Sequence, residues 1–163
     1  MIPEPTRPIV NPEQPARWQP HVTVAAIIEK DARFLLVEEC INGQLLLNQP
    51  AGHWENGETL IDAISRETLE ETAWHFKPEY LVGIYQWQPP EQPQSTFLRF
   101  AFAGSLSGFE EDRELDSPIT RTLWYKHQEI KESQDRHRSP QLLRCVEDYL
   151  KGKRYPLQVL NKL

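Results

Sequence analysis

Three glutamates, Glu67, Glu70 and Glu71, are spaced so that one stretch of helix brings them together. With about 3.6 residues per helical turn, their side chains fall within an arc of roughly 100°. Like charges at these spacings repel one another. A hard divalent cation reverses that effect, because Mg²⁺ takes carboxylate oxygens as ligands. On its own, the pattern also fits a solvated acidic helix face, which is common.

The helix that carries these carboxylates is expected over residues 59–75. Thr59 and Asp62 make a capping-box-like start. Pro78 ends the helix soon after, and we expect the helix to run on through Trp74. A mostly apolar stripe beside the glutamates can bind the helix to a sheet; it consists of Leu60, Ile61, Ile64 and Thr68.

The segment before this helix makes the pattern far more specific. Gly52 is followed after five residues by Glu58, and after seven more by Arg66 and Glu67. Together with the two later glutamates, six fixed positions match, which chance would produce with a probability on the order of 10⁻⁵. The spacing resembles the signature of the Nudix hydrolases, which continues with an apolar residue, Glu-Glu and a second glycine.

Two positions depart from that signature. Thr68 stands where an aliphatic residue is usual, and Ala73 replaces the second glycine. Thr is close in shape to Val, so packing can survive. Ala73 makes a left-handed end of the helix less accessible, at about 1 kcal/mol. Neither change touches a carboxylate.

The resemblance implies a role for each matched carboxylate. Glu67, Glu70 and Glu71 would hold one or more Mg²⁺ or Mn²⁺ ions, and the carbonyl of Gly52 could add a ligand. Such a cation polarises a phosphoryl oxygen, neutralises charge on the leaving phosphate and lowers the pKa of bound water. Which glutamate accepts the proton stays open.

Two further features complete the catalytic set that the resemblance implies. Glu58 and Arg66 would form an ion pair that joins loop to helix and orients the carboxylates. One more carboxylate is expected from another loop, and the acidic stretch 110–116 offers several. We favour Asp116, then Glu114, although a purely solubilising loop fits the same stretch.

Candidate substrate-binding residues lie outside the signature glutamates. Arg99 alternates with apolar neighbours on a predicted strand, so it could clamp a phosphate or make a surface ion pair. His53 could donate to a phosphate or make a structural hydrogen bond. Trp87 and Trp54 could stack a ring, although core packing is the more frequent use of tryptophan.

Runs rich in apolar and β-branched residues predict strands at 21–28, 34–38, 45–47, 81–87, 96–102 and 119–125, and a second helix at 141–150. This order indicates an α+β fold with a mixed sheet between helices. The resemblance implies the Nudix fold, an α/β/α sandwich. Stretches across most of the chain are similar to the NudJ-type phosphatase branch, which implies small substrates such as nucleoside di- and triphosphates and the pyrimidine diphosphate precursor of thiamine.

The 163 residues fit one domain. Six prolines among the first twenty residues predict an extended arm over 1–20, which leaves 21–163 as the folded domain. A net charge of −6 argues against a nucleic-acid surface. No stretch approaches the ~20 apolar residues of a membrane span, and no secretory signal is visible. We therefore expect a cytoplasmic monomer or homodimer in which Cys40 and Cys145 are buried, reduced thiols.

The favoured function is Mg²⁺-dependent hydrolysis of a pyrophosphate bond in a small organic di- or triphosphate, with release of phosphate. One alternative is a hydrolase of another nucleoside diphosphate linked to a second group. A second is a Nudix-fold binding module that has lost catalysis, although its expected mark, erosion of the glutamates, is absent. A third is an α+β protein whose acidic helix is incidental.

Overall fold

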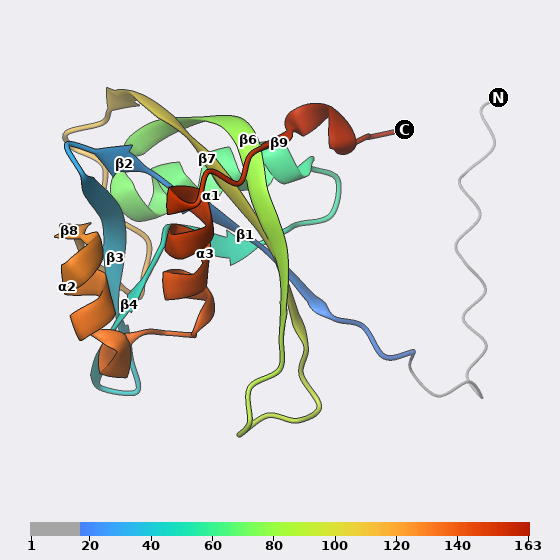
Figure 1. Cartoon of the computed structure of the whole chain (residues 1–163), viewed down its shortest axis with the longest axis horizontal. Helices are drawn as coiled ribbons and strands as arrows, with labels where there is room; N and C mark the ends of the chain where they lie inside the picture. The colour runs from blue at the N-terminus through green and yellow to red at the C-terminus, as the bar shows by residue number, and fades with distance from the viewer. Residues whose placement is uncertain (1–16) are drawn as a thin grey trace, which may run out of the picture.

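Two β-sheets form the centre of the computed structural model, which describes residues 17–163 (Figure 1). The larger sheet contains, in spatial order, β5 (Ala51–His53), β1 (His21–Ile27), β7 (Phe97–Phe109), β6 (Trp74–Trp87) and β9 (Tyr155–Pro156). Strands β1 and β7 are parallel and the other neighbours are antiparallel, so this sheet is mixed.

The smaller sheet is antiparallel throughout. Its central strand is β3 (Arg33–Ile41). This strand pairs with each of the other three, which are β2 (Glu29–Lys30), β4 (Gln44–Asn48) and β8 (Ile119–Lys126). Residues far apart in the sequence therefore meet at β3. This arrangement matters for the site, because β3 and β4 supply one wall of a cleft whose other wall comes from the larger sheet.

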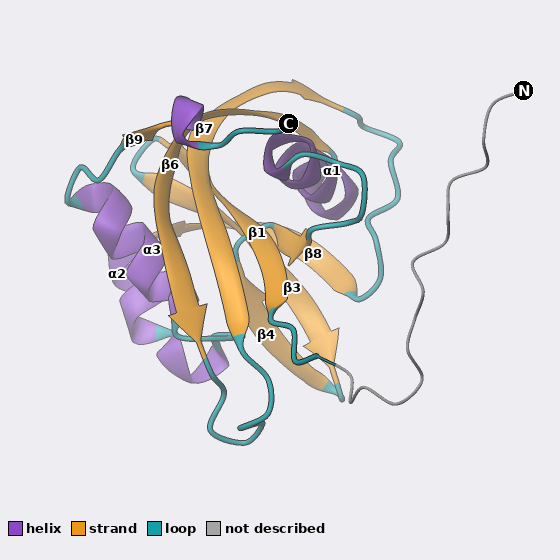
Figure 2. Ribbon diagram, turned by 90° about the vertical axis from the view of Figure 1, so that its right-hand side faces the viewer, coloured by secondary structure: helices purple, strands orange, loops and turns teal. Residues whose placement is uncertain are grey.

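Helices cover both sides of the sheets (Figure 2). Helix α1 (Leu60–Thr72) packs Ile64 and Ala63 into one apolar cluster with residues of β1, β6 and β7. Helices α2 (His127–Glu132) and α3 (Gln141–Leu150) contribute to a second cluster. Two short 3₁₀ turns occupy residues 134–136 and 157–159. The predicted α+β class, an α/β/α sandwich with a mixed sheet, is confirmed.

The end of helix α1 differs from the prediction that the helix runs on through Trp74. The helix ends at Thr72, and Ala73 adopts the left-handed conformation with φ 61°. Its amide donates to the carbonyl of Leu69, and Trp74 already pairs with Phe109 as the first residue of β6. Strand pairing thus offsets the modest cost of placing alanine, rather than glycine, at this position.

The exposure of one cysteine and the lengths of two strands also differ from the predictions. Cys40 and Cys145 are free thiols, but only Cys145 is buried, because Cys40 faces solvent near the end of β3. Strands β6 and β7 are longer than predicted, and Pro78 lies within β6 at an irregularity in its pairing with β7.

Of the predicted arm, residues 1–16 lie outside the described residues. No helix among residues 17–163 is long and apolar enough to cross a membrane.

A buried carboxylate joins β3 to β8 and to the 3₁₀ turn at residues 134–136. Glu38 on β3 is 2% exposed and accepts hydrogen bonds from Arg121 on β8 and from Arg136. The hydrogen bond from Arg121 is the main reason that the pKa of Glu38 falls to about 2. A carboxyl with a lowered folded-state pKa stabilises the fold above its unfolded-state pKa, and this contribution is lost as the pH falls toward 2.

We predict that Glu38→Gln lowers the free energy of unfolding by about 2 kcal/mol at pH 7, allowing for the solvent exposure of both arginines. The difference between variant and wild type should fall to about half between pH 5 and pH 3, because the carboxyl of the unfolded chain takes up its proton across this window while that of the folded protein, with a pKa of about 2, stays ionised. Urea denaturation of both proteins at each pH measures it. An unchanged difference at pH 3 would contradict the ion-pair explanation.

Candidate active site

Helix α1 presents the signature glutamates along one edge of its buried face. Its start is the predicted capping box: Thr59 accepts from the amide of Asp62, and Asp62 accepts from the amide of Thr59. Thr68, the unusual residue of the signature, is fully buried and donates to the carbonyl of Ile64 at 2.8 Å. The hydroxyl is therefore satisfied within the helix, and the departure from an aliphatic residue leaves the packing intact.

Arg66 lies at the centre of the carboxylate group. Its Nε and Nη2 donate to both oxygens of Glu58, at 3.1 and 2.8 Å, and Nη2 also donates to the carbonyl of His53. Its Nη1 donates to Glu67 at 2.8 Å and to Glu70 at 3.1 Å. The expected ion pair between Glu58 and Arg66 is thus present, and the same guanidinium also orients two glutamates of the helix.

Gly52 is required by the close approach of β5 to this helix. A Cβ atom at this position would lie 2.0 Å from Cδ of Glu67 and 2.2 Å from each of its carboxylate oxygens. Real Cβ atoms keep longer distances from their neighbours than these, so only glycine leaves room here for the carboxylate of Glu67. The carboxylate of Glu67 therefore rests against the backbone of β5, next to the Gly52 carbonyl that the signature implies as a ligand.

Glu71 is the most buried of the three glutamates, at 9% exposed, and accepts a hydrogen bond from the amide of Ala51 at 2.9 Å. Burial, with the negative charges of Glu39, Glu67 and Asp116 around it, raises its pKa to about 9. Burial likewise raises the pKa of Glu67, against the opposing effect of Arg66. The carboxylates are thus held where their negative charge is unfavourable without a cation.

A divalent cation fits this donor set. The three glutamates supply only oxygen, the ligand type of Mg²⁺ and Mn²⁺, and the space beside Gly52 already accommodates a carboxylate. Within residues 17–163, no three acidic, histidine or cysteine side chains converge closely enough to hold an ion as they stand. The reason is that Arg66 draws Glu67 and Glu70 toward itself, so a cation would compete with this guanidinium for them.

The acidic loop after β7 reaches the end of helix α1. The amide of Asp116 donates to the carbonyl of Glu70 at 3.0 Å, and the charge of Asp116 is one of those that raise the pKa of Glu71. Glu114 lies in the same loop, and both side chains are exposed. Asp116 therefore has the better position to supply a further carboxylate, and its role as a ligand stays a prediction.

A cleft of about 440 Å³ opens between the two sheets beside these carboxylates. It contains Gly52 and Glu71 together with all three residues expected to bind substrate, His53, Trp87 and Arg99. Burial lowers the pKa of His53, and the nearby His21 adds to the effect. Trp54 lies outside the cleft lining; it is half exposed, and its indole donates to the carbonyl of Glu58.

Arg99 is 5% exposed and donates to the side-chain oxygens of Gln49 and Asn48. Burial lowers its pKa, while the charges of Glu39 and Glu71 oppose that effect. It forms no ion pair within 4 Å in the described part of the chain, so the surface ion pair considered for it is wrong. Its Nε has no hydrogen-bond partner among those residues, which leaves a buried donor beside the cleft.

Several cleft residues were not singled out from the sequence. They come from β1, β3, β4, the segment before α3 and the first residue of α3, and are Thr23, Glu39, Asn48, Arg138, Ser139 and Gln141. Asn48 links two of the charges, because its amide donates to Glu39 at 3.1 Å and its oxygen accepts from Arg99. The amide of Arg138 donates to the carbonyl of Leu47, which fixes this segment against β4. These residues reach the cleft through contacts between segments that are far apart in the sequence, so the sequence alone does not identify them.

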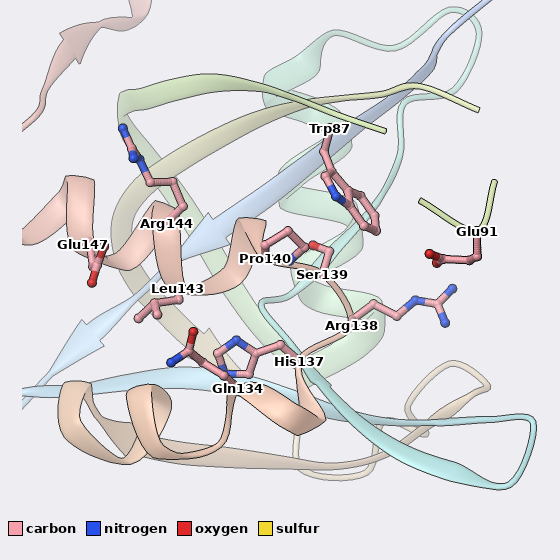
Figure 3. A pocket seen from close by; sticks show the side chains of 10 residues that line it. All are labelled: Trp87, Glu91, Gln134, His137, Arg138, Ser139, Pro140, Leu143, Arg144 and Glu147. Carbon is pink, nitrogen blue, oxygen red and sulfur yellow. The ribbon is translucent and has the colours of Figure 1, made fainter. Parts of the chain in front are cut away.

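A second cavity of about 420 Å³ adjoins the cleft (Figure 3). The two share Trp87, Glu91, Arg138 and Ser139. Figure 3 shows Arg138 extending toward Glu91. The space beside Trp87 therefore continues beyond the cleft.

Comparisons with known proteins place this chain among relatives of one family. The NUDIX domain model matches residues 18–145. Phosphatase NudJ of Escherichia coli (strain K12) is 40% identical over 144 residues, which cover 88% of this chain and 92% of that protein. The solved structure of a NUDIX hydrolase from Nitrosomonas europaea is 50% identical, with a TM-score of 0.86 over 89% of this chain and 98% of its own. A UDP-X diphosphatase structure, 19% identical, shares the fold with a TM-score of 0.68 over 87% of this chain and 68% of its own.

The chain therefore belongs to the Nudix family. It is a Nudix pyrophosphohydrolase or phosphatase, an enzyme that hydrolyses pyrophosphate bonds. Nudix hydrolases generally use divalent metal ions and act on small phosphorylated substrates.

We predict that Gly52→Ala lowers kcat/KM at least ~100-fold, about 2.7 kcal/mol, because the added Cβ displaces the carboxylate of Glu67. The fold should persist, since a flexible side chain can move aside. The matched control is Gly108→Ala in β7, where a Cβ would meet its nearest atom at 3.6 Å; its activity should stay within about twofold of wild type. More than a tenth of wild-type kcat/KM in Gly52→Ala would refute the role of this close approach.

Proposed function

We propose that the protein is a Mg²⁺- or Mn²⁺-dependent hydrolase of small organic di- and triphosphates that releases orthophosphate. The observation that carries this proposal is the group of carboxylates on one edge of α1, Glu67, Glu70 and Glu71, of which Glu71 is buried and lines the same cleft as Trp87 and Phe97. The similarity to a phosphatase of the NudJ type supports a substrate with one organic group, such as a nucleoside di- or triphosphate or a pyrimidine diphosphate.

The phosphate end of the substrate is assigned to the carboxylates of α1. When bound there, a divalent cation supplies charge neutralisation for the phosphates and an electrophile for the phosphoryl group. Glu67, Glu70 and Glu71, with the Gly52 carbonyl and Asp116, would hold it. Arg66 and Glu58 position these carboxylates and do not touch the reacting atoms.

Residues of this chain then bind and orient the substrate. Arg99 and His53 line the same cleft as Glu71, and both can donate to phosphate oxygens. A carboxylate near the attacked phosphorus takes the proton of the attacking water.

The organic group of the substrate is assigned to the aromatic end. Trp87 and Phe97 lie with ring centroids 5.8 Å apart, and Phe97 stacks on His21 with centroids 4.8 Å apart. Trp87 and Phe97 both line the cleft. A ring stacked on Trp87 would gain about 1–3 kcal/mol.

A second candidate function has one observation in its favour. The cavity on the far side of Trp87 offers room for a second organic group, as in a nucleoside diphosphate linked to a sugar or to another nucleoside. We favour the substrate with a single organic group because the far cavity holds no carboxylate group comparable to that of α1 among its lining residues.

We predict that turnover requires added Mg²⁺ or Mn²⁺, and that Glu70→Gln and Glu71→Gln each lower kcat more than tenfold, over ~1.4 kcal/mol. Each change removes a charged ligand with little change of shape. Glu132→Gln on α2, an exposed glutamate away from the cleft, is the matched control. Phosphate release measured with and without excess chelator tests the requirement. Undiminished hydrolysis in chelator, with no retained metal by elemental analysis, would rule the mechanism out.

We predict that kcat/KM is highest for a nucleoside triphosphate or a pyrimidine diphosphate, and that Trp87→Ala raises KM more than it lowers kcat, the pattern of lost uniform binding. The measurement compares these two substrates with a dinucleoside polyphosphate and a nucleotide sugar, reading phosphate against pyrophosphate release. A tenfold preference for either of the last two would instead favour the second candidate function.

A further inference from the structure

Two buried hydrogen-bond donors lie next to each other in the cleft without a partner. Thr23 on β1 is 8% exposed, Arg99 on β7 is buried as well, and both line the cleft. Among residues 17–163, neither the hydroxyl of Thr23 nor Nε of Arg99 has a hydrogen-bond partner. Leaving a buried polar group unpaired costs free energy, so two such groups in one cleft indicate a ligand that both contact.

Strand pairing places Thr23 between two other donors of the cleft. Its register partner on β7 is Arg99, and its register partner on β5 is His53. Residues directly opposite each other on neighbouring strands, which are about 4.8 Å apart, face the same side of a sheet. His53, Thr23 and Arg99 therefore form one row of donors across three strands. The row begins beside Gly52, next to the carboxylate of Glu67.

The free atoms of this row require an acceptor on the ligand. The guanidinium of Arg99 is held by the side-chain oxygens of Gln49 and Asn48, to which Nη1 and Nη2 donate, so Nε is the nitrogen left for a ligand. A hydroxyl can donate or accept, but a guanidinium only donates. An atom that contacts both Thr23 and Arg99 must therefore be an acceptor, and a positive charge away from water favours an anionic one.

We propose that the Thr23 hydroxyl and Nε of Arg99 together bind the phosphate next to the attacked one, so that Thr23 is a further substrate-binding residue. The attacked phosphate lies at the cation held by the carboxylates of α1, beside β5, and β1 and β7 are the next two strands of the sheet. Water adds to the terminal phosphorus, the anhydride P–O bond breaks, and the bridging oxygen leaves on the phosphate bound by Thr23 and Arg99. This inference rests on the proposed function and specifies how the same cleft holds the leaving group.

The test uses two substitutions that separate the hydroxyl from the shape of the side chain. Thr23→Val keeps the shape without the hydroxyl, and Thr23→Ser keeps the hydroxyl. Calorimetric titration at saturating Mg²⁺ compares UMP, the leaving group of UDP, with uridine, which has no phosphate. The wild-type protein should bind UMP at least tenfold more tightly than uridine. Thr23→Val should weaken UMP binding at least fivefold and leave uridine binding within twofold, whereas Thr23→Ser should stay within threefold of wild type for UMP.

Two further measurements accompany the titrations. The kcat/KM for UDP should fall at least fivefold in Thr23→Val and stay within threefold of wild type in Thr23→Ser. The urea midpoint of Thr23→Val should be no lower than that of wild type, because the substitution removes a buried hydroxyl that has no partner in the protein. A purely structural threonine would lose stability and affinity together. Thr122→Val is the matched control, since Thr122 lies on β8 outside the cleft lining, and it should bind UMP as wild type does.

Three results would overturn the proposal. The first is wild-type affinity for UMP and uridine within twofold of each other, which would assign the free donors to the organic group or to no ligand. The second is Thr23→Val with unchanged UMP affinity. The third is Thr23→Val with a lower urea midpoint and no recovery of UMP binding in Thr23→Ser. If the wild-type protein hydrolyses no di- or triphosphate in the presence of Mg²⁺, the proposed function fails, and the titrations still decide whether Thr23 binds a phosphate.

Discussion

The guanidinium of Arg66 joins three parts of the chain that otherwise have no reason to stay together. It binds both oxygens of Glu58 in the loop, the carbonyl of His53 at the end of β5, and the carboxylates of Glu67 and Glu70 on its own helix. Hydrogen bonding to Glu58 raises its own pKa further, so it stays charged under all conditions in which the protein is folded. Loop, strand and helix are thus joined by one cation, which positions the carboxylates of Glu58, Glu67 and Glu70.

The same arrangement explains why the site favours a divalent cation. Arg66 compensates Glu58, Glu67 and Glu70 but makes no contact with Glu71, which relies on a single backbone amide for stabilisation. As a result, the pKa of Glu71 is raised to about 9 in the absence of a metal. A group held in so unfavourable an environment gains more from a nearby cation than an exposed carboxylate would. The packing of helix α1 against the sheets stabilises the fold and so keeps Glu71 in this unfavourable environment.

The part of the site that could be predicted from the sequence is the part that is local. Glu67, Glu70 and Glu71 lie on one helix, so their spacing alone places them together, and Thr59 marks where the helix begins. Glu39 gave no such signal, because it reaches the cleft only through the pairing of β3 with β4 and β8. The end of helix α1 at Ala73 was mispredicted for a related reason: pairing of β6 with β7 outweighs the local preference of alanine.

Arg99 brings a positive charge among the carboxylates of the cleft. It is 5% exposed, and the negative charges of Glu39 and Glu71 counteract the effect of burial on its pKa. Asn48 connects it to the smaller sheet, since Asn48 bonds to both Arg99 and Glu39. Because the Nε of Arg99 has no hydrogen-bond partner among residues 17–163, it can donate to a phosphate oxygen without breaking the bonds that hold the guanidinium in place. The cleft therefore holds a fixed cation near the carboxylates that would bind the divalent ion, and both favour phosphates in that part of the cleft.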